Sequence, residues 1–274
     1  MNQTLSAFGD IEARYTLLKS VAGNAAKLGM DYYTRRENLT VIHKENDLQD
    51  VVSVADKAVE DYIRCELSKA FPSDGFLGEE GGALDLEARY LWVIDPIDGT
   101  SCFVNGLHSW CVSIGLMVDG LPVLGAIADP NHGELFHACR GAGAFVNDTV
   151  IRVHAAQHVR EGLTGVGTTY RRGKESFLPF LQGLLDEGGM FIRNGSAALM
   201  ISYVAAGRLI GYYETNLKSW DCLAGLVVLQ EAGGIASDFL RNNGLLDGNS
   251  LLVACPGVYE QLSDLVGPSL DTDC

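Results

Sequence analysis

The chain has 274 residues, of which 47% are hydrophobic and 20% are charged, and its 20 Lys and Arg against 35 Asp and Glu give a net charge of −15. This length and apolar content fit one large folded domain or two closely joined ones, and they exclude a disordered tail protein. The acidic excess argues against partners that are nucleic acids or anionic membranes, because phosphate groups need neutralising Lys and Arg. An anionic small ligand would need another source of positive charge, such as a bound divalent cation.

The cysteines and the N-terminal region indicate where the protein resides. Seven cysteines are scattered along the chain without a Cys-x-x-Cys pair, which favours reduced thiols over a disulfide framework. The first 30 residues are amphipathic and lack the basic and apolar segments of a signal peptide. No apolar run approaches the roughly 18 residues that a membrane span needs. We therefore expect a cytoplasmic protein.

The first half of the chain predicts two helices followed by strands. Apolar residues recur every three or four positions from Ile11 to Leu28, which is typical of one buried helical face. A second helix is expected over about residues 52–70, ended by Pro72 and Gly75. The strands that follow are expected to form an antiparallel sheet covered by the two helices: residues 76–77, 91–94, 111–118 and 123–128.

Beyond about residue 152 the pattern changes to alternating strands and helices. The expected strands are residues 163–166, 209–213 and 251–254, and the expected helices are residues 176–186, 197–206, 221–232 and 258–266. Because no repeat or low-complexity linker intervenes, we expect an α+β half over residues 1–150 and an α/β half over residues 151–274, joined in one compact catalytic unit.

The segment from Trp92 to Thr100 contains the most informative motif. Its four leading apolar residues predict a buried strand, and Pro96 is expected to end the strand, so that Asp95 and Asp98 would lie in a loop. Two carboxylates at this spacing can converge on a cation, while Gly99 allows neighbouring amides to face an anionic oxygen. Taken alone, such a segment is more often a solvated turn.

Three further acidic residues favour a metal site over a solvated turn. Glu79 lies in a glycine-bracketed loop, Asp56 in the first turn of a predicted helix, and Asp221 follows Trp220 at the start of another. Individually, Asp56 is explained as a favourable charge at a helix N-terminus and Asp221 as a helix cap. Together, acids at the starts and ends of elements indicate a site for a hard cation such as Mg²⁺.

On these motifs the chain resembles the inositol monophosphatase family, within the Mg²⁺-dependent, lithium-sensitive sugar phosphatases. The motifs are Asp95-Pro96-Ile97-Asp98-Gly99-Thr100, Gly78-Glu79-Glu80, and Trp220-Asp221 followed by Gly225 and Glu231-Ala232-Gly233-Gly234. The resemblance implies an α+β fold, namely a layered αβαβα sandwich of the inositol monophosphatase and fructose-1,6-bisphosphatase type. Family members are commonly homodimers, so we expect a homodimer here.

The resemblance also implies roles for individual residues. Two or three Mg²⁺ per active site would be held mostly by the first half of the chain, with one ligand from the second half: the side chains of Glu79, Asp95, Asp98 and Asp221, and the carbonyl oxygen of Ile97. Asp56 would support the metal-bound water, while Glu79 and the Thr100 hydroxyl would orient the attacking water. Substrate contacts would come from residues of both halves: Asp98, Gly99, Thr100, Gly195, Ser196, Ala197, Glu214 and Asp221.

The expected chemistry is hydrolysis of a phosphate monoester by direct in-line attack of a metal-activated water. A phosphate monoester repels hydroxide, so one cation is needed to activate the water and another to stabilise the leaving alkoxide. The chain offers no rival nucleophile, because it has no Gly-x-Ser-x-Gly motif and Cys102 has no histidine near it in sequence.

Small polyol phosphates are the expected substrates, with inositol monophosphate first. The chain has Ser101-Cys102 where inositol-type members usually have Thr-Asn, and this departure leaves histidinol phosphate as the alternative substrate. A 3′,5′-bisphosphate nucleotidase ranks third and a noncatalytic metal-binding regulator last. Lys44 matches a family lysine only loosely, and the basic segment 171–174 is interpreted as a solvated loop or, alternatively, as a grip on a charged substrate.

Overall fold

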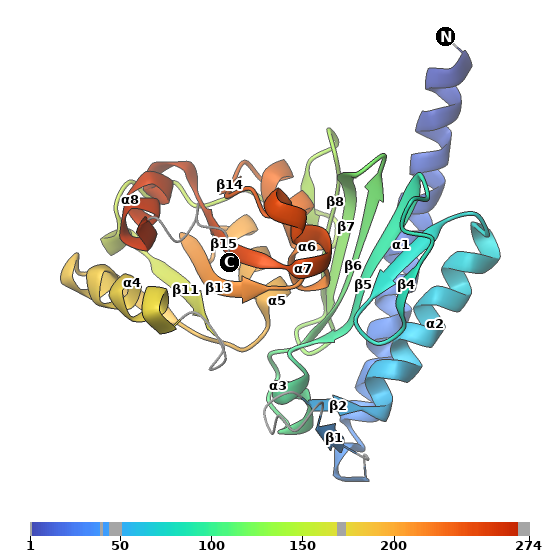
Figure 1. The fold of residues 1–274 in the computed structure, drawn as a ribbon, viewed down its shortest axis with the longest axis horizontal. Coiled ribbons are helices and arrows are strands. Elements are labelled where there is room, and N and C mark those ends of the chain that lie inside the picture. The colour runs from blue at the N-terminus through green and yellow to red at the C-terminus, as the bar shows by residue number, and fades with distance from the viewer. Residues whose placement is uncertain (1, 39–40, 44–50, 169–173, 268–274) are drawn as a thin grey trace.

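The computed structural model describes residues 2–38, 41–43, 51–168 and 174–267, and it confirms the αβαβα sandwich. Two sheets alternate with three layers of helices (Figure 1). Lys44 and residues 171–173 of the basic segment lie outside the described residues.

The first layer is a pair of long helices, α1 (Asn2–Tyr33) and α2 (Val54–Ala70). α1 is longer than its apolar pattern predicted at both ends, and α2 begins two residues later than expected. Leu18 of α1 and Ile63 of α2 lie in one buried cluster with Trp92 of the larger sheet, so the two helices pack on that sheet. Before α2 lie the short helix η1 (Arg36–Asn38) and an antiparallel pair of strands, β1 (Val41–His43) and β2 (Val51–Ser53).

The larger sheet has eight strands in the order β10-β9-β8-β7-β6-β5-β3-β4. Their bounds are β3 (Gly75–Gly78), β4 (Gly82–Leu84), β5 (Tyr90–Asp98), β6 (Cys111–Val118), β7 (Leu121–Asp129), β8 (Glu134–Cys139), β9 (Ala144–Val146) and β10 (Thr149–Val150). The prediction of a wholly antiparallel sheet was wrong for one pair. After the β3–β4 hairpin the chain returns to the other side of β3, so that β5 runs parallel to β3.

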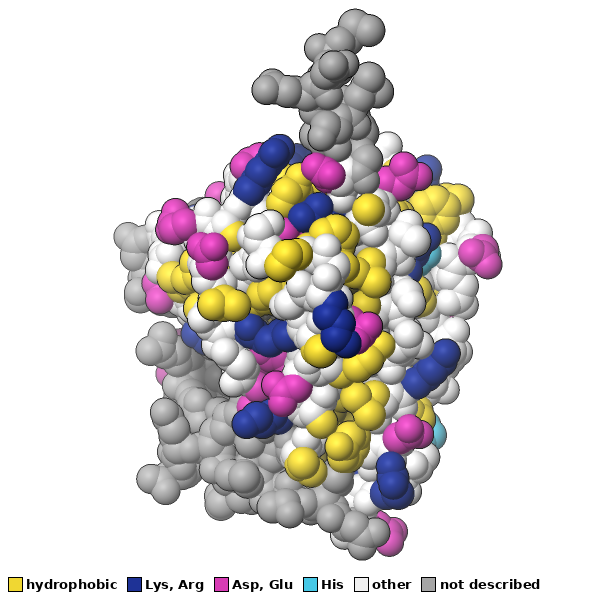
Figure 2. Space-filling model, turned by 90° about the vertical axis from the view of Figure 1, so that its right-hand side faces the viewer, with side chains coloured by type: hydrophobic (Ala, Val, Ile, Leu, Met, Phe, Trp, Pro, Cys, Tyr) yellow, Lys and Arg dark blue, Asp and Glu magenta, His cyan; other side chains and the backbone are white. Residues whose placement is uncertain are grey.

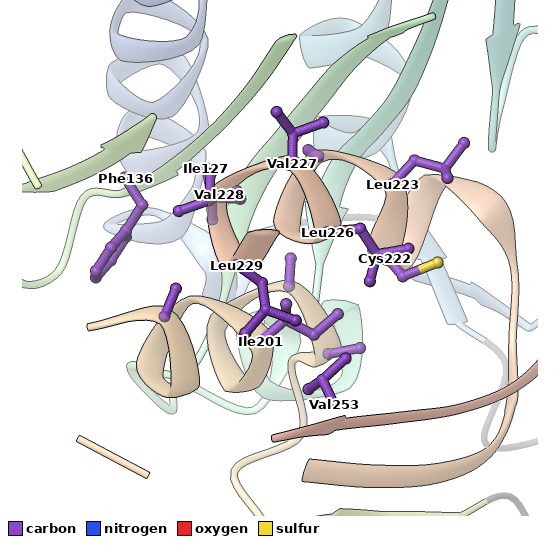
Figure 3. Packing of buried hydrophobic residues seen from close by; sticks show 14 of the residues in the cluster. Ile127, Phe136, Ile201, Cys222, Leu223, Leu226, Val227, Val228, Leu229 and Val253 are labelled. Atoms are coloured by element: carbon purple, nitrogen blue, oxygen red, sulfur yellow. The ribbon is translucent and has the colours of Figure 1, made fainter. Parts of the chain in front are cut away.

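The middle layer consists of α5 (Ala197–Ala205) and α6 (Ser219–Glu231), which lie between the two sheets. Figure 3 shows Leu229 of α6 next to Ile201 of α5, with Phe136 and Val253 of the two sheets on either side. Residues 222–229 of α6 are apolar or small and are all buried, as expected for a segment that is covered on every side. The short helix α3 (Thr100–Val104) follows the end of the strand at Asp98, and the short helix α7 (Gly244–Asp247) contacts α6.

The smaller sheet has five strands in the order β12-β11-β13-β15-β14. They are β11 (Leu163–Gly167), β12 (Met190–Ile192), β13 (Gly211–Leu217), β14 (Ile235–Ala236) and β15 (Asn249–Ala254). The last layer, α4 (Lys174–Asp186) and α8 (Pro256–Val266), packs on its outer face through Phe180, Val258 and Leu262. The short helices η2 (Val159–Glu161) and η3 (Arg241–Asn243) complete the described chain.

Two local predictions about the site segments were wrong. Pro96 does not end β5, which continues to Asp98 with a bulge between the pairs Asp95–Ser113 and Asp98–Cys111. A bulge tolerates proline because its residues need not donate to the ladder. Asp221 is not at the N-cap position of α6, which Lys218 occupies; it is the third helical residue, and its carboxylate accepts the Lys218 amide in a capping box.

The surface on the side of α1 and α2 carries both signs of charge. Figure 2 shows Lys, Arg, Asp and Glu side chains scattered among hydrophobic ones over the coloured part of this face. Within the described ranges, no helix combines the length and the apolar character required to cross a membrane.

Candidate active site

The predicted site residues lie together in one pocket where the two sheets meet the starts of α3, α5 and α6. The pocket is lined by all but one of them: Glu79, Asp95, Ile97, Asp98, Gly99, Thr100, Gly195, Ser196, Ala197, Glu214 and Asp221. The exception, Asp56, is buried on α2 and lies 3.2 Å from the Thr100 hydroxyl through its Oδ1.

Three carboxylates form the centre of the pocket. Asp95, Asp98 and Asp221 each offer a ligand oxygen, and these oxygens lie within 4.8 Å of one another. Local backbone geometry holds two of them: Asp95 Oδ1 accepts a hydrogen bond from the Ile97 amide (3.0 Å), and Asp221 Oδ2 accepts one from the Lys218 amide (2.8 Å). The β5 bulge and the first turn of α6 thus aim carboxylates from different layers at one point.

Asp98 is held by the N-terminus of α5. Its Oδ2 accepts hydrogen bonds from the Ser196 hydroxyl (2.5 Å) and the Ala198 amide (2.7 Å), and its Oδ1 accepts one from the Ala197 amide (3.3 Å). Ser196 and Ala197 were predicted to contact substrate. In the structure, their donors are engaged with a carboxylate of the acidic cluster.

The acidic cluster is electrostatically costly without a cation. Burial raises the pKa of Asp98 to about 6 even though hydrogen bonds from Ser196 and Ala198 act in the opposite direction. Burial and the neighbouring carboxylates Glu79 and Asp98 raise the pKa of Asp95 well above its ordinary value. Asp221 is shifted upward in the same way, by lost hydration first and then by Asp98 and Glu79. Clustered hard oxygen donors of this kind fit Mg²⁺ better than a softer metal.

The turn after the cluster has a backbone conformation that requires glycine. Gly99 has a φ of +92°, and a Cβ there would lie 2.6 Å from the Ser109 carbonyl oxygen, so only glycine fits. α3 begins at the next residue, Thr100. The Thr100 hydroxyl lies 3.0 Å from the carbonyl oxygen of Ile97 as well as near Asp56, so its single proton has two acceptors.

The opposite end of the pocket is built from the smaller sheet. The Tyr212 hydroxyl donates a hydrogen bond to Glu214 Oε2, and both side chains lie on the same face of β13. In register with them, Gly165 and Gly167 of β11 leave the space that the ring and the carboxylate occupy. Burial raises the pKa of Glu214 to about 7, while Tyr212 and Arg193 oppose the shift.

Several pocket residues were missed from the sequence: Val166, Gly167, Arg193, Met200, Tyr212, Asn216 and Leu217. A signal existed for some of them. Tyr212 stands two residues before Glu214, which in a strand places it on the same face. Arg193 stands just before the segment 195–197 that the family resemblance had marked. Their convergence depends on strand pairing, which the sequence pattern left open.

The inositol monophosphatase family matches residues 10–268. The chain belongs to this family. It is 40% identical over 246 residues to the inositol-1-monophosphatase of Mesorhizobium japonicum, covering 88% of this chain and 92% of that protein. It is 36% identical over 255 residues to the protein named Nus factor SuhB of Pasteurella multocida, covering 92% of this chain and 94% of that protein.

Similarity to solved structures agrees with this assignment. The crystal structure of the extragenic suppressor protein suhB from Bartonella henselae superposes with a TM-score of 0.87 at 34% identity, covering 93% of this chain and 98% of that one. Membership confirms the resemblance inferred from the motifs and supports a phosphatase. The family is generally Mg²⁺-dependent, and the acidic cluster offers a matching set of ligands.

Proposed function

We propose that this protein is a Mg²⁺-dependent phosphatase of the cytoplasm, acting as a homodimer on small phosphate monoesters, with inositol monophosphate as the leading substrate. The observation that carries the proposal is the convergence of Asp95, Asp98 and Asp221 beside the Gly99–Thr100 turn in one pocket. A cation at the acids and a phosphate at the turn would lie next to each other, as hydrolysis of a monoester requires.

In this proposal the ions are held by the side chains of Glu79, Asp95, Asp98 and Asp221 and by the Ile97 carbonyl. When bound, Mg²⁺ supplies Lewis-acid activation of the attacking water and neutralises charge on the leaving oxygen. The amides of Gly99 and Thr100 bind the phosphate oxygens and fix the phosphorus relative to the carboxylates.

Thr100, Glu79 and Asp56 orient the water. The Thr100 hydroxyl donates a hydrogen bond to Asp56 or to the Ile97 carbonyl, so a lone pair of its oxygen can accept a hydrogen bond from the water. Glu79 accepts a hydrogen bond from the other O–H group of the water. A lone pair of the water oxygen then faces the phosphorus. As the water oxygen bonds to phosphorus, Glu79 takes up one proton of the water and the bond from phosphorus to the ester oxygen breaks. The departing alkoxide takes a proton from a solvent water, and Glu79 later releases its proton to solvent.

The other end of the pocket selects the alcohol. Glu214, held by Tyr212, accepts hydrogen bonds from the hydroxyl groups of a polyol. The same carboxylate would pair with the ammonium group of histidinol phosphate, and Arg193 would pair with the second phosphate of a 3′,5′-bisphosphate. These two remain the alternative substrates.

Release of phosphate by the purified full-length protein with Mg²⁺ tests the proposal. We expect turnover of inositol 1-phosphate to exceed that of histidinol phosphate and of adenosine 3′,5′-bisphosphate. A higher kcat/KM for either of the latter would make that compound the leading substrate. If none of the three released phosphate, the proposed phosphatase activity would be wrong.

A regulatory role is the second candidate, because relatives of similar identity and coverage are named Nus factor SuhB. The two candidates differ in their need for the acids. Expression of the Asp98→Asn variant in a host strain that lacks the protein separates them: a regulator would still restore the wild-type phenotype without turnover, whereas an enzyme would not.

A further inference from the structure

α2 carries a second buried carboxylate that has no task in the proposed chemistry. Glu60 is 1% exposed and lies one helical turn after Asp56, so both acids are on the face of α2 that packs against the larger sheet. Burying a carboxylate is costly unless its oxygens accept hydrogen bonds. Its partners therefore indicate what it holds in place.

The partners of Glu60 are backbone amides of the turn between β3 and β4. Glu60 Oε2 accepts a hydrogen bond from the Glu80 amide (2.8 Å), and Oε1 accepts one from the Gly81 amide (2.9 Å). Oε1 also accepts a hydrogen bond from Arg64 Nε (2.6 Å), and Arg64 Nη2 donates one to the carbonyl oxygen of Gly82 (2.6 Å). Three consecutive residues of the turn are thus tied to α2.

The glycines of the turn make this contact possible. A Cβ on Gly78 would lie 2.1 Å from Glu60 Oε1, and one on Gly81 would lie 2.6 Å from the same oxygen. Real atoms do not approach so closely, so a side chain at either position would displace the Glu60 carboxylate from the turn amides. The glycine-bracketed sequence around Glu79 is therefore matched to a carboxylate on a different element.

The remaining member of the turn, Glu79, is fixed from the opposite side. Its amide donates to the Ile94 carbonyl oxygen (3.2 Å), immediately before Asp95 on β5. Glu79 thus lies between a backbone bond to the strand of the acidic cluster and residues clamped by Glu60 and Arg64. These bonds fix the backbone of Glu79 beside the pocket that its side chain lines.

We propose that Glu60 and Arg64 are positioning residues that hold the β3–β4 turn so that Glu79 faces the metal site. This inference rests on the proposed function and adds residues to its machinery. One face of α2 then sets both groups that orient the water: Asp56 contacts Thr100, and Glu60 holds the turn that carries Glu79. A rigid helix fixes the distance between these two contacts.

The test is Glu60→Gln in the full chain. The amide keeps the shape of the side chain but replaces one acceptor oxygen by a donor, which then faces an N–H of the turn or of Arg64. Calorimetric titration with Mg²⁺ should show about tenfold weaker binding, the lower range for residues that support metal ligands. With saturating Mg²⁺, kcat for inositol 1-phosphate should fall while KM changes less than twofold.

Glu66→Gln is the matched control. Glu66 is on the same helix but is partly exposed and pairs with the exposed Lys69, so its substitution should leave Mg²⁺ affinity and kcat unchanged. Arg64→Gln provides a second variant in case Glu60→Gln does not fold. It removes the bonds from Arg64 to Glu60 and to Gly82 while Glu60 keeps the turn amides, so Mg²⁺ binding should weaken by about fivefold, less than in Glu60→Gln.

A purely structural role for Glu60 predicts a different result. The thermal stability of the metal-free variants would fall while their Mg²⁺ affinity stayed at the wild-type value, and this outcome would overturn the inference. If wild type and variants bind Mg²⁺ as expected but no substrate is turned over, only the proposed function fails. A wild-type chain that binds no Mg²⁺ would overturn both.

Discussion

The two ends of the pocket are built in different ways. At the acid end, Asp95, Asp98 and Asp221 each accept a hydrogen bond from a backbone amide, and the Ser196 hydroxyl adds one side-chain bond, to Asp98. At the alcohol end, Glu214 is held by the side chain of Tyr212 and lies over the open backbone of Gly167. Backbone amides do not change with residue type, whereas side-chain partners do. The acid end is therefore constrained to one chemistry, and the alcohol end can be altered by substitution.

The difference between the two ends of the pocket is tested most directly by a substitution at the acid end. Asp98→Asn should lower kcat roughly a thousandfold, because about 4 kcal/mol of stabilisation by the bound cations corresponds to three powers of ten. The measurement is phosphate release from inositol 1-phosphate with saturating Mg²⁺. Asp119→Asn, on an exposed turn, is the control and should be fully active. Wild-type kcat in Asp98→Asn would mean that the assigned acids are not the reactive centre.

The position of Asp221 depends on how closely α6 approaches the larger sheet. A Cβ on Gly125 would lie 2.1 Å from the Ala224 carbonyl oxygen, so Gly125→Ala should destabilise the fold by about 2 kcal/mol and weaken Mg²⁺ binding. Urea denaturation measures the first effect and calorimetry the second. Gly23→Ala, where the added methyl group meets no atom within 4 Å, should be neutral or stabilising. Equal stability of the two variants would contradict the packing argument.

The alcohol end should respond through substrate affinity. Glu214→Gln should raise KM for inositol 1-phosphate about tenfold, the cost of about one hydrogen bond to a charged group, while Mg²⁺ affinity stays unchanged. Tyr212→Phe should act in the same direction with a smaller effect, because it removes only the support of that carboxylate. If either substitution lowered Mg²⁺ affinity instead, the separation of the pocket into two ends would be wrong.

The smallest expected effect is a pH dependence of stabilisation by metal. Since burial raises the folded-state pKa of Asp98 to about 6, its contribution to the stability of the metal-free protein is full below about pH 4 and is lost as pH rises through 6. Asp95 and Asp221 shift in the same direction. A cation relieves this loss, so the rise in Tm on adding Mg²⁺ should be about 3 °C larger at pH 8 than at pH 5.5.

Thermal unfolding with EDTA and with Mg²⁺ at the two pH values measures this difference. Glu214→Gln should keep the dependence, because that residue belongs to the other end of the pocket. An increase in Tm that is the same at both pH values would argue that the acids are not where the cation binds.

Local patterns in the sequence predicted most of the elements, and the exceptions are informative. The helical period from Ile11 to Leu28 and the proline and glycine after residue 70 predicted α1 and the end of α2. The same reasoning failed at Pro96, because whether a proline ends a strand or lies in a bulge depends on the neighbouring strand β6. The parallel pairing of β3 with β5 was missed for the same reason, since pairing is a property of two segments.

The candidate site shows where motif reasoning stops. Acids inside recognisable motifs, such as Asp95 and Glu79, were found from the sequence. Glu60 was missed although it stands four residues after Asp56, because a buried glutamate on a helix has no distinctive neighbours in sequence. Tyr212 was missed because the predicted strand ended at residue 213, whereas β13 continues to Leu217 and so places Glu214 on the same strand face as Tyr212.

The sequence by itself determined the longer helices, the central strands, the family and the residue types that converge on a cation. These follow from the period of apolar residues and from short motifs, which act over a few neighbouring positions. Only the tertiary structure decided that Asp221 reaches Asp98 across the sandwich, that α5 supplies the amides holding Asp98, and that Glu60 fits the glycines around Glu79. Contacts of this kind depend on how closely whole layers pack, and no local stretch of the chain encodes that distance.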